Sequence, residues 1–260
     1  MYKSEKLFPD TWRIIDEFDE ALYLINKKDH ACLIDTGMDH DSLSDYVKSL
    51  TDKPIIVLLT HGHIDHIGRC GEFETVCMDP KDSAIYQEHQ VMAEGPQFII
   101  SSTLPAPFPM DMEGIIPIEL QGHTPGSTIF VDMDNHAVYT GDALGSGCGV
   151  WMQIEGALTI EEYRNGIHHA LEKLKALGCD DTWKFFGGHA NQEYQSKVSA
   201  YNPLCLALVK DMETLCTNLL NDEVQLTQVE VKSDSVPYYA SYGKAEILTT
   251  KERIHPLQHH

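Results

Sequence analysis

Short apolar runs separated by polar turns fill the first sixty residues. The runs TWRIIDEF, ALYLINKK and HACLIDTG have the length and the β-branched or aromatic content of strands. The run KPIIVLLT at 53–60 is apolar almost throughout, as expected of a short buried strand. Ahead of it, the spacing of apolar residues in DSLSDYVKSL predicts a helix. The chain is therefore predicted to open with strands of a sheet and a helix beside them.

Strands and helices alternate again in the second half of the chain. Strands are predicted at 114–121, 127–134, 136–144 and 182–189. The segment 159–177 has an apolar residue at every third or fourth position, which is the stripe of a helix that packs on one face. A further helix is predicted at 203–220. Two successive sets of strands and helices predict an α+β fold in which sheets pack between helices.

The middle of the chain has predicted helices and a strand, followed by a stretch without periodicity. Residues 67–73 and 80–90 predict helices, and residues 75–79 predict a strand between them. From 95 to 114, four prolines interrupt any steady period. A stretch of this length without periodicity predicts a long loop, for which a flap over a cleft is one interpretation.

No repeat, low-complexity tract or linker divides the 260 residues, so we predict one domain over 1–260 with a strand-like tail at 224–260. The chain has no run of roughly 18 apolar residues, and its first residues do not resemble a signal peptide. Its seven cysteines form no CxxC pair. These features predict a cytoplasmic protein with reduced thiols.

Charge narrows the classes of partner. The chain has 40 acidic and 19 basic residues, which gives a formal net charge of −21. Such a surface repels phosphate backbones and anionic lipid heads, so neither nucleic acid nor a membrane is predicted as a partner. A small-molecule substrate remains, and the sequence does not indicate the oligomeric state.

The stretch THGHIDHIG follows the apolar run at 53–60. It places His61, His63, Asp65 and His66 within six residues. Burying three imidazoles and a carboxylate together is costly unless they share a partner. A divalent metal ion is such a partner, because imidazole and carboxylate groups suit zinc, iron and manganese.

Three more candidate ligands stand at the ends of other apolar runs. His123 lies in QGHTPGS, Asp142 in YTGDAL and His189 in FFGGHA. With the first cluster they make five histidines and two aspartates, which suits a centre of two metal ions about 3.5–4 Å apart. The chain has no serine-centred elbow motif, so the pattern favours a metal-activated water as the nucleophile.

These motifs resemble the metallo-β-lactamase superfamily. HGHIDH, the His of GHTPGS, the Asp of TGD and the His of GGH occur in the family's order and at similar spacing, and LIDTG with Asp35 is similar to a feature near the start of the family's fold. The resemblance covers about residues 12 to 195. It implies a four-layer αββα sandwich with the site on loops at one edge of the two sheets. It also implies two ligand sets. The set for one metal is His61, His63 and His123, the set for the other is Asp65, His66 and His189, and Asp142 bridges both.

The resemblance implies a dinuclear metal-dependent hydrolase in which a metal-bridging hydroxide cleaves a small ester, thioester or lactone. Zn²⁺ is the favoured ion, with Fe²⁺ and Mn²⁺ as alternatives. Asp65 would be catalytic as well as a ligand, because it is placed to hold or move a proton.

Several branches of the family can be weighed from residues. The segment GDALGSGCGVWMQIEGALTIEEY is similar to an element of the glyoxalase II group, the hydroxyacylglutathione hydrolases, although Val150 replaces an arginine of that element. The lactonase branch uses a tyrosine near the site, for which the candidates are Tyr163, Tyr194, Tyr238 and Tyr239. Trp151, Met152, Phe98 and Phe108 are candidates to line the substrate cleft, with core packing as the alternative for all four.

Three other reactions are alternatives. The β-lactamase subclasses lose or replace one of the seven ligands, whereas this chain has all of them. A small-phosphodiester hydrolase would need cations to grip phosphate, and no basic cluster lies near the motif. A dioxygenase relative would bind a single iron, which the two ligand sets disfavour.

Overall fold

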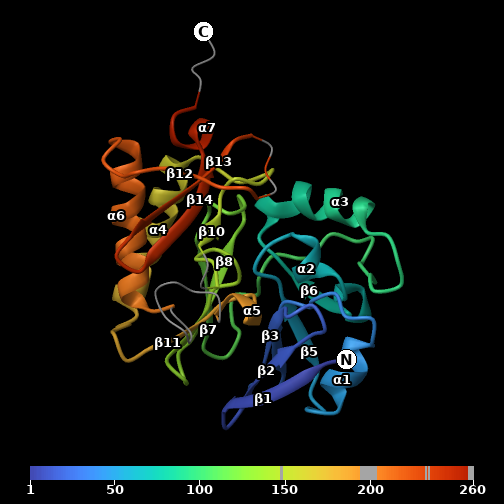
Figure 1. Ribbon diagram of the computed structural model, residues 1–260. Helices are drawn as coiled ribbons and strands as arrows, with labels where there is room; N and C mark the ends of the chain where they lie inside the picture. The colour runs from blue at the N-terminus through green and yellow to red at the C-terminus, as the bar shows by residue number, and fades with distance from the viewer. Residues whose placement is uncertain (147–148, 194–203, 232, 234, 257–260) are drawn as a thin grey trace.

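Two sheets face each other between outer helices in the computed structural model (Figure 1), which describes residues 1–146, 149–193, 204–231, 233 and 235–256. The first sheet has the order β1-β2-β3-β4-β5-β6. Its strands are β1 (Lys3–Phe8), β2 (Thr11–Ile15), β3 (Ala21–Asn26), β4 (Ala31–Ile34), β5 (Ile55–Leu58) and β6 (Thr75–Cys77). Neighbours pair antiparallel as far as β4, and β4, β5 and β6 then pair in parallel.

The second sheet has the order β11-β9-β8-β7. It is formed by β7 (Ile115–Glu119), β8 (Thr128–Asp132), β9 (Ala137–Tyr139) and β11 (Lys184–Phe186). A smaller third sheet, in the order β10-β14-β13-β12, contains β10 (Val150–Trp151), β12 (Thr227–Gln228), β13 (Pro237–Tyr242) and β14 (Ala245–Thr250). The strand-like tail predicted from the sequence thus forms most of this third sheet.

Strand β3 shows why the first sheet is buried on both faces. Because successive side chains of a strand point to opposite faces, Leu22 and Leu24 pack toward the helices while Tyr23 and Ile25 pack against the second sheet. The helices on this side are α1 (Leu43–Lys48), α2 (Ile64–Ile67) and α3 (Ser83–Met92). These four side chains are fully or almost fully buried, which explains the uninterrupted apolar run.

Two long helices lie on the outer side of the second sheet: one packs against β7, and the other packs against that helix and against β13 and β14 of the third sheet. They are α4 (Ile160–Ala176) and α6 (Leu206–Leu220), which lie at the left in Figure 1. Helix α4 begins with a capping box, in which the Thr159 side chain accepts from the Glu162 backbone and the Glu162 carboxylate accepts from Thr159 N–H. Its stripe, which includes Tyr163 and Ile167, packs against the sheet. The three apolar interfaces, helix–sheet, sheet–sheet and sheet–helix, are those of an αββα sandwich, and the α+β prediction is confirmed.

The structure differs from the predicted elements in a few places. Strand β1 was not predicted because its sequence, KSEKLF, is mostly polar and mostly exposed at the sheet edge. The helix predicted at 67–73 begins earlier, at Ile64, and is followed by a 3₁₀ turn at Cys70–Glu72. Two single turns, α5 (Ala190–Glu193) and α7 (Lys251–Ile254), were also not predicted.

Residues 95–114 form an irregular segment, as predicted, that runs beside the first sheet. Ala106 bridges to Cys77 of β6, and the backbones of Gly71 and Ile99 are hydrogen bonded. The Phe108 ring packs edge-on against Phe130 between the two sheets, with centroids 5.2 Å apart. Phe108 is therefore a core residue, and the flap interpretation of 95–114 stays a prediction.

Within the described ranges, no helix is both long enough and apolar enough to cross a membrane. The six described cysteines are all free thiols, and five of them are buried. The seventh, Cys148, lies outside the described residues.

A buried ion pair joins the two sheets at the end of β3. The Lys27 ammonium, whose side chain is 3% exposed, lies 2.8 Å from Asp132 and 2.9 Å from Asp134. Asp132 is the last residue of β8 in the facing sheet and accepts a further hydrogen bond from Asn135. The pair therefore fastens one sheet to the other at the edge of the sandwich.

Replacing Lys27 with methionine should lower the free energy of unfolding by about 3–5 kcal/mol, because the Asp132 carboxylate would stay buried without its cation. Urea unfolding measures the change. The matched control is Lys28→Met, since the neighbouring Lys28 side chain is 86% exposed and surface substitutions usually change stability by less than about 0.5 kcal/mol. Equal losses in the two variants would contradict a structural role for the buried pair.

Candidate metal centre

The histidine motif lies where β5 leaves the first sheet. His61 follows the strand, His63 is the N-cap of the single-turn helix α2, and Asp65 and His66 lie on that turn. The other candidate ligands follow strands of the second sheet: His123 follows β7, Asp142 follows β9 and His189 follows β11. All seven predicted residues therefore meet at one edge of the sandwich.

Asp82 fastens the loops of the two sheets together. This fully buried carboxylate accepts from Gly62 N–H at 2.9 Å, from the Thr124 hydroxyl at 2.7 Å and from Gly126 N–H at 2.5 Å. It therefore ties the loop of His63 to the loop of His123. Asp82 is at the N-cap position of α3, yet its side chain does not cap that helix.

Three imidazoles converge in the first group. His61 Nε2 and His123 Nε2 each lie 3.0 Å from His63 Nδ1. A tetrahedral zinc ion, at about 2.1 Å from each nitrogen, holds its ligands roughly 3.4 Å apart. The spacing of the three nitrogens is close to that geometry, and all three rings are buried.

The remote ring nitrogens of this group set the tautomers. His123 Nδ1 donates to the Trp151 carbonyl at 2.8 Å. His61 Nδ1 donates to the Thr60 hydroxyl, whose own proton goes to Asp35. In a neutral ring both Nε2 atoms then carry lone pairs, and burial lowers the pKa values of His61 and His123, which keeps the rings neutral. Two lone pairs facing a single nitrogen of His63 fit a shared cation.

The second group combines carboxylates with imidazoles. His66 Nε2 and His189 Nε2 each lie 3.6 Å from Asp65 Oδ2. Behind the rings, His66 Nδ1 lies 2.8 Å from Asp35 and His189 Nδ1 lies 2.6 Å from Glu20. These outer carboxylates turn both Nε2 lone pairs inward, as in the carboxylate–histidine–metal arrangement of metalloproteins.

Asp142 lies between the two groups. One carboxylate oxygen is 3.0 Å from His189 Nε2 and 3.8 Å from His123 Nε2, and the other is 3.6 Å from His66 Nε2. Among the described residues, the His66 Nε2 atom and the Asp142 Oδ1 atom are buried without a hydrogen-bond partner. Buried polar atoms are normally paired, so the two orphaned atoms fit a ligand that both would bind.

Electrostatics also favours a cation in the second group. Burial lowers the pKa of His66 and His189, but the surrounding carboxylates, Asp65 and Asp142 foremost, outweigh burial and hold both pKa values well above the usual range. Burial raises the pKa of Asp142 less than His189 and His66 lower it, and the net shift is strongly downward. The donor set of the seven residues thus fits two divalent ions.

Sequence reasoning missed Glu20. Its backbone bridges to His189, and neighbouring hydrogen bonds join Ala21 to Gly188 and Asp19 to Ala190. Burial raises the pKa of the Glu20 carboxyl to about 8. Glu20 stands in a turn between two strands of the first sheet, far along the chain from His189, and no local pattern marks the contact.

Gly188 is required by the close approach of these groups. A Cβ atom at this position would lie 2.6 Å from Asp142 Oδ1 and 2.8 Å from the His66 ring. The second glycine of the GGH motif therefore makes room for Asp142 and His66.

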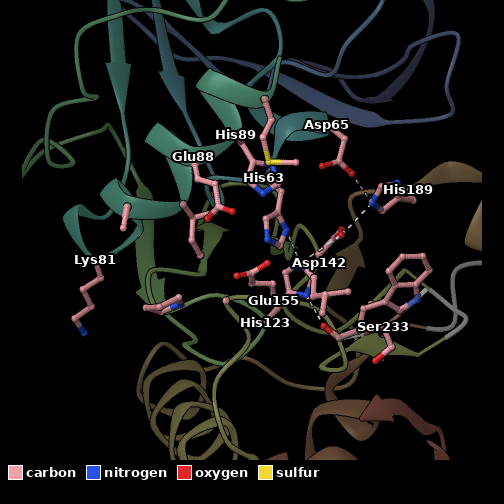
Figure 2. A pocket seen from close by; sticks show the side chains of 18 of the residues that line it. His63, Asp65, Lys81, Glu88, His89, His123, Asp142, Glu155, His189 and Ser233 are labelled. Carbon is pink, nitrogen blue, oxygen red and sulfur yellow. Dashed lines mark hydrogen bonds and ion pairs between the residues drawn. The ribbon is translucent and has the colours of Figure 1, made fainter. Parts of the chain in front are cut away.

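A cavity of about 690 Å³ opens in front of the two groups (Figure 2). His63, Asp65, His123, Asp142 and His189 form its floor. Residues of α3 make one wall, and Trp151 with the loop that follows it makes the other.

Several residues considered from the sequence can now be placed. Trp151 lines the cavity as predicted, whereas Met152 is buried in the core and Tyr163 donates to the Ala143 carbonyl beneath the site. Tyr238 and Tyr239 lie on β13 and do not line the cavity. Tyr194 lies outside the described residues.

His89, which the sequence places only at the end of a helix, also lines the cavity. Its Nδ1 accepts from Ile64 N–H at 3.0 Å, and its ring centroid is 5.0 Å from that of His63.

Comparison with known proteins agrees with this architecture. The hydroxyacylglutathione hydrolase GloC of Haemophilus influenzae is 27% identical over 195 residues, which cover 67% of this chain and 86% of that protein. The probable metallo-hydrolase YqgX of Bacillus subtilis is 30% identical over 142 residues, which cover 49% of this chain and 66% of that protein.

Solved structures share the fold. The metallo-beta-lactamase FIM-1 from Pseudomonas aeruginosa, in its mono-zinc form, superposes with a TM-score of 0.60 and 12% identity over 84% of this chain and 95% of that one. TTHA1623, in a di-iron-bound form, gives a TM-score of 0.55 with 23% identity over 73% and 98%. Residues 16–189, from the β2–β3 turn to the last histidine of the site, match the family directly, and the chain belongs to the metallo-beta-lactamase superfamily.

Proposed function

We propose that this protein is a dinuclear metal-dependent hydrolase that cleaves a small ester, thioester or lactone. The observation that carries the proposal is the position of Asp142 between two complete groups of donors, with one of its oxygens and His66 Nε2 buried and unpartnered. A shared carboxylate between two imidazole groups is the arrangement expected of a bridging ligand.

The residues divide into the two ligand sets that the family resemblance implies. His61, His63 and His123 would hold one ion, Asp65, His66 and His189 would hold the other, and Asp142 would be shared between them. When bound, two divalent ions lower the pKa of a shared water and polarise the oxygen that gains negative charge. Zn²⁺ is the ion that we favour, and iron is an alternative because TTHA1623 is a di-iron-bound relative in fold.

Asp65 is the residue that we assign to proton transfer. Its side chain is 25% exposed and lines the cavity, whereas His66 behind it is 1% exposed. A carboxylate at this boundary can accept a proton from the attacking water and deliver it to the leaving group. Its contacts with His66 and His189 hold it in place for both steps.

Thioester cleavage has support from the relatives, because GloC of Haemophilus influenzae is a hydroxyacylglutathione hydrolase. The test is a substrate panel of thioesters, lactones, β-lactams and phosphodiesters, assayed with protein of known metal content. We expect two equivalents of metal and turnover of a thioester, an ester or a lactone. One bound iron with oxygen uptake would overturn the proposal, as would turnover of β-lactams or phosphodiesters alone.

Replacing Glu20 with glutamine should weaken binding of the second metal about 10- to 100-fold, the usual effect of losing a carboxylate that orients a metal-binding histidine. Glutamine keeps the volume but replaces the carboxyl group that contacts His189 Nδ1 with an amide. Metal content after dialysis against a competing chelator measures the effect. The control is Glu17→Gln in the same turn, since Glu17 contacts only His40 and backbone N–H groups at the surface. Equal metal retention in both variants would show that Glu20 does not position His189.

A further inference from the structure

The outer part of the cavity is apolar on both walls. Ala84, Ile85 and Met92 of α3 face Trp151 and Ile154 across it. Trp151 and Met92 are 41% and 60% exposed, so both offer apolar surface to a ligand. Exposed apolar side chains lining a cavity in front of a reactive centre are suited to contact an apolar part of a substrate.

Two carboxylates are set into these apolar walls. Glu88 projects from α3 and Glu155 from the opposite loop, and Figure 2 shows both pointing into the cavity. Neither has a hydrogen-bond or ion-pair partner among the described residues. Lys81 is the lining residue with a positively charged side chain, but its ammonium contacts Glu119, and Figure 2 shows it pointing away.

We infer that this cavity selects substrates whose outer part is apolar and positively charged or neutral, and that it disfavours anionic ones. The inference rests on the proposed function, since it names the substrate class of the same site. A cavity with low-dielectric walls focuses the field of Glu88 and Glu155. Trp151 adds an aromatic face, which attracts an ammonium group.

The charge of the outer cavity distinguishes this protein from enzymes that recognise glutathione. The glutathionyl group has two carboxylates and one ammonium, so it brings a net negative charge to the cavity. Glu88 and Glu155 in the outer part of the cavity would repel it, and the described lining residues include no unpaired Lys or Arg side chain beside them. We therefore assign thioesters or esters of a cationic or neutral thiol or alcohol to the site.

The test uses butyryl thioesters of three thiols of similar size: thiocholine, propanethiol and 3-mercaptopropionate. Thiol release by the metal-loaded protein should give kcat/KM values in the order cationic, neutral, anionic. The variant Glu88→Gln/Glu155→Gln should lower the cationic-to-anionic ratio at least tenfold and leave the neutral substrate within about threefold, and salt should weaken the preference. The control, Glu161→Gln/Glu172→Gln, removes the same charge from the exposed face of α4.

Quenching of Trp151 fluorescence by ions tests the charge of the cavity without turnover. In a Trp12→Phe/Trp183→Phe background, Trp151 is the remaining tryptophan. Its fluorescence should be quenched more strongly by Cs⁺ than by I⁻, and the Glu88→Gln/Glu155→Gln variant should reverse or abolish the difference. Equal or better turnover of the anionic thioester, or a quenching ratio that the variant leaves unchanged, would overturn the inference. No thiol release, together with Cs⁺-selective quenching that depends on the two glutamates, would refute the proposed thioesterase activity and leave the charge selectivity standing.

Discussion

The Asp142→Ala variant is expected to lose one of its two metal ions and to fall on the order of 10³-fold in kcat/KM, equivalent to about 4 kcal/mol of transition-state stabilisation. The reason is geometric. Asp142 is within 3.0–3.8 Å of His66, His123 and His189, which belong to both donor groups. Alanine removes the ligand that the two ions share, and the remaining imidazoles of the two groups cannot replace it. Metal analysis and steady-state kinetics on one preparation would measure both effects.

The matched control for this variant is Asp52→Ala, because Asp52 is exposed and distant from the site. The control should keep its metal content and its rate. Circular dichroism and the thermal midpoint would show whether Asp142→Ala is folded. A folded Asp142→Ala protein with two metals and normal turnover would mean that the bridging assignment is wrong.

Removing both metals with a chelator should abolish hydrolysis and lower the free energy of unfolding. Ligand binding to the native state stabilises it by about 4 kcal/mol per site when the free ion is at 1,000 times its Kd. In the apo protein the Asp65 and Asp142 carboxylates, which both lie near His189 Nε2, are also left without a dication. Urea unfolding before and after chelation, and again after Zn²⁺ is restored, would measure the change.

The restored sample is the control for chemical damage during chelation. Activity and the unfolding midpoint should both return with the metal. If the chain keeps its activity and its midpoint after metal analysis shows that the ions are gone, the seven residues are not a metal centre. If the midpoint falls and activity is absent even with metal, the site binds ions and the proposed chemistry is wrong.

The candidate ligands could be predicted because they follow apolar strands. The sequence around each candidate ligand places a His or Asp just after a strand, and the ends of these strands meet at one edge of the fold. His61 and His189 are 128 positions apart in the chain, yet each could be identified from a few neighbouring letters. The apolar runs of β3 and β5 were equally informative, because both strands lie between layers.

The supporting residues could not be predicted in the same way. Glu20 acts through a pairing between the β2–β3 turn and the β11–α5 loop, and Asp82 through contacts with Thr124 and Gly126. These contacts depend on how two sheets pack, which no local period encodes. Strand β1 was missed because an exposed edge strand needs no apolar side chains. For Phe108 the sequence left open whether it lines the cleft or packs on the core, and its loop turns inward to the core.

The hydrogen bonds of Asp82 have a consequence for dividing this chain into two fragments. The irregular segment 95–114 divides the chain into two lobes, and each candidate metal group draws donors from both: His61 and His63 meet His123, and Asp65 and His66 meet His189. After a cut in that segment, the N-terminal fragment would hold two residues of each three-residue ligand set and the Asp82 carboxylate. The C-terminal fragment would hold the third ligand of each set, with Thr124 and Gly126. Association of the two fragments should then depend on the metal ions, and recovery of hydrolysis would measure that association.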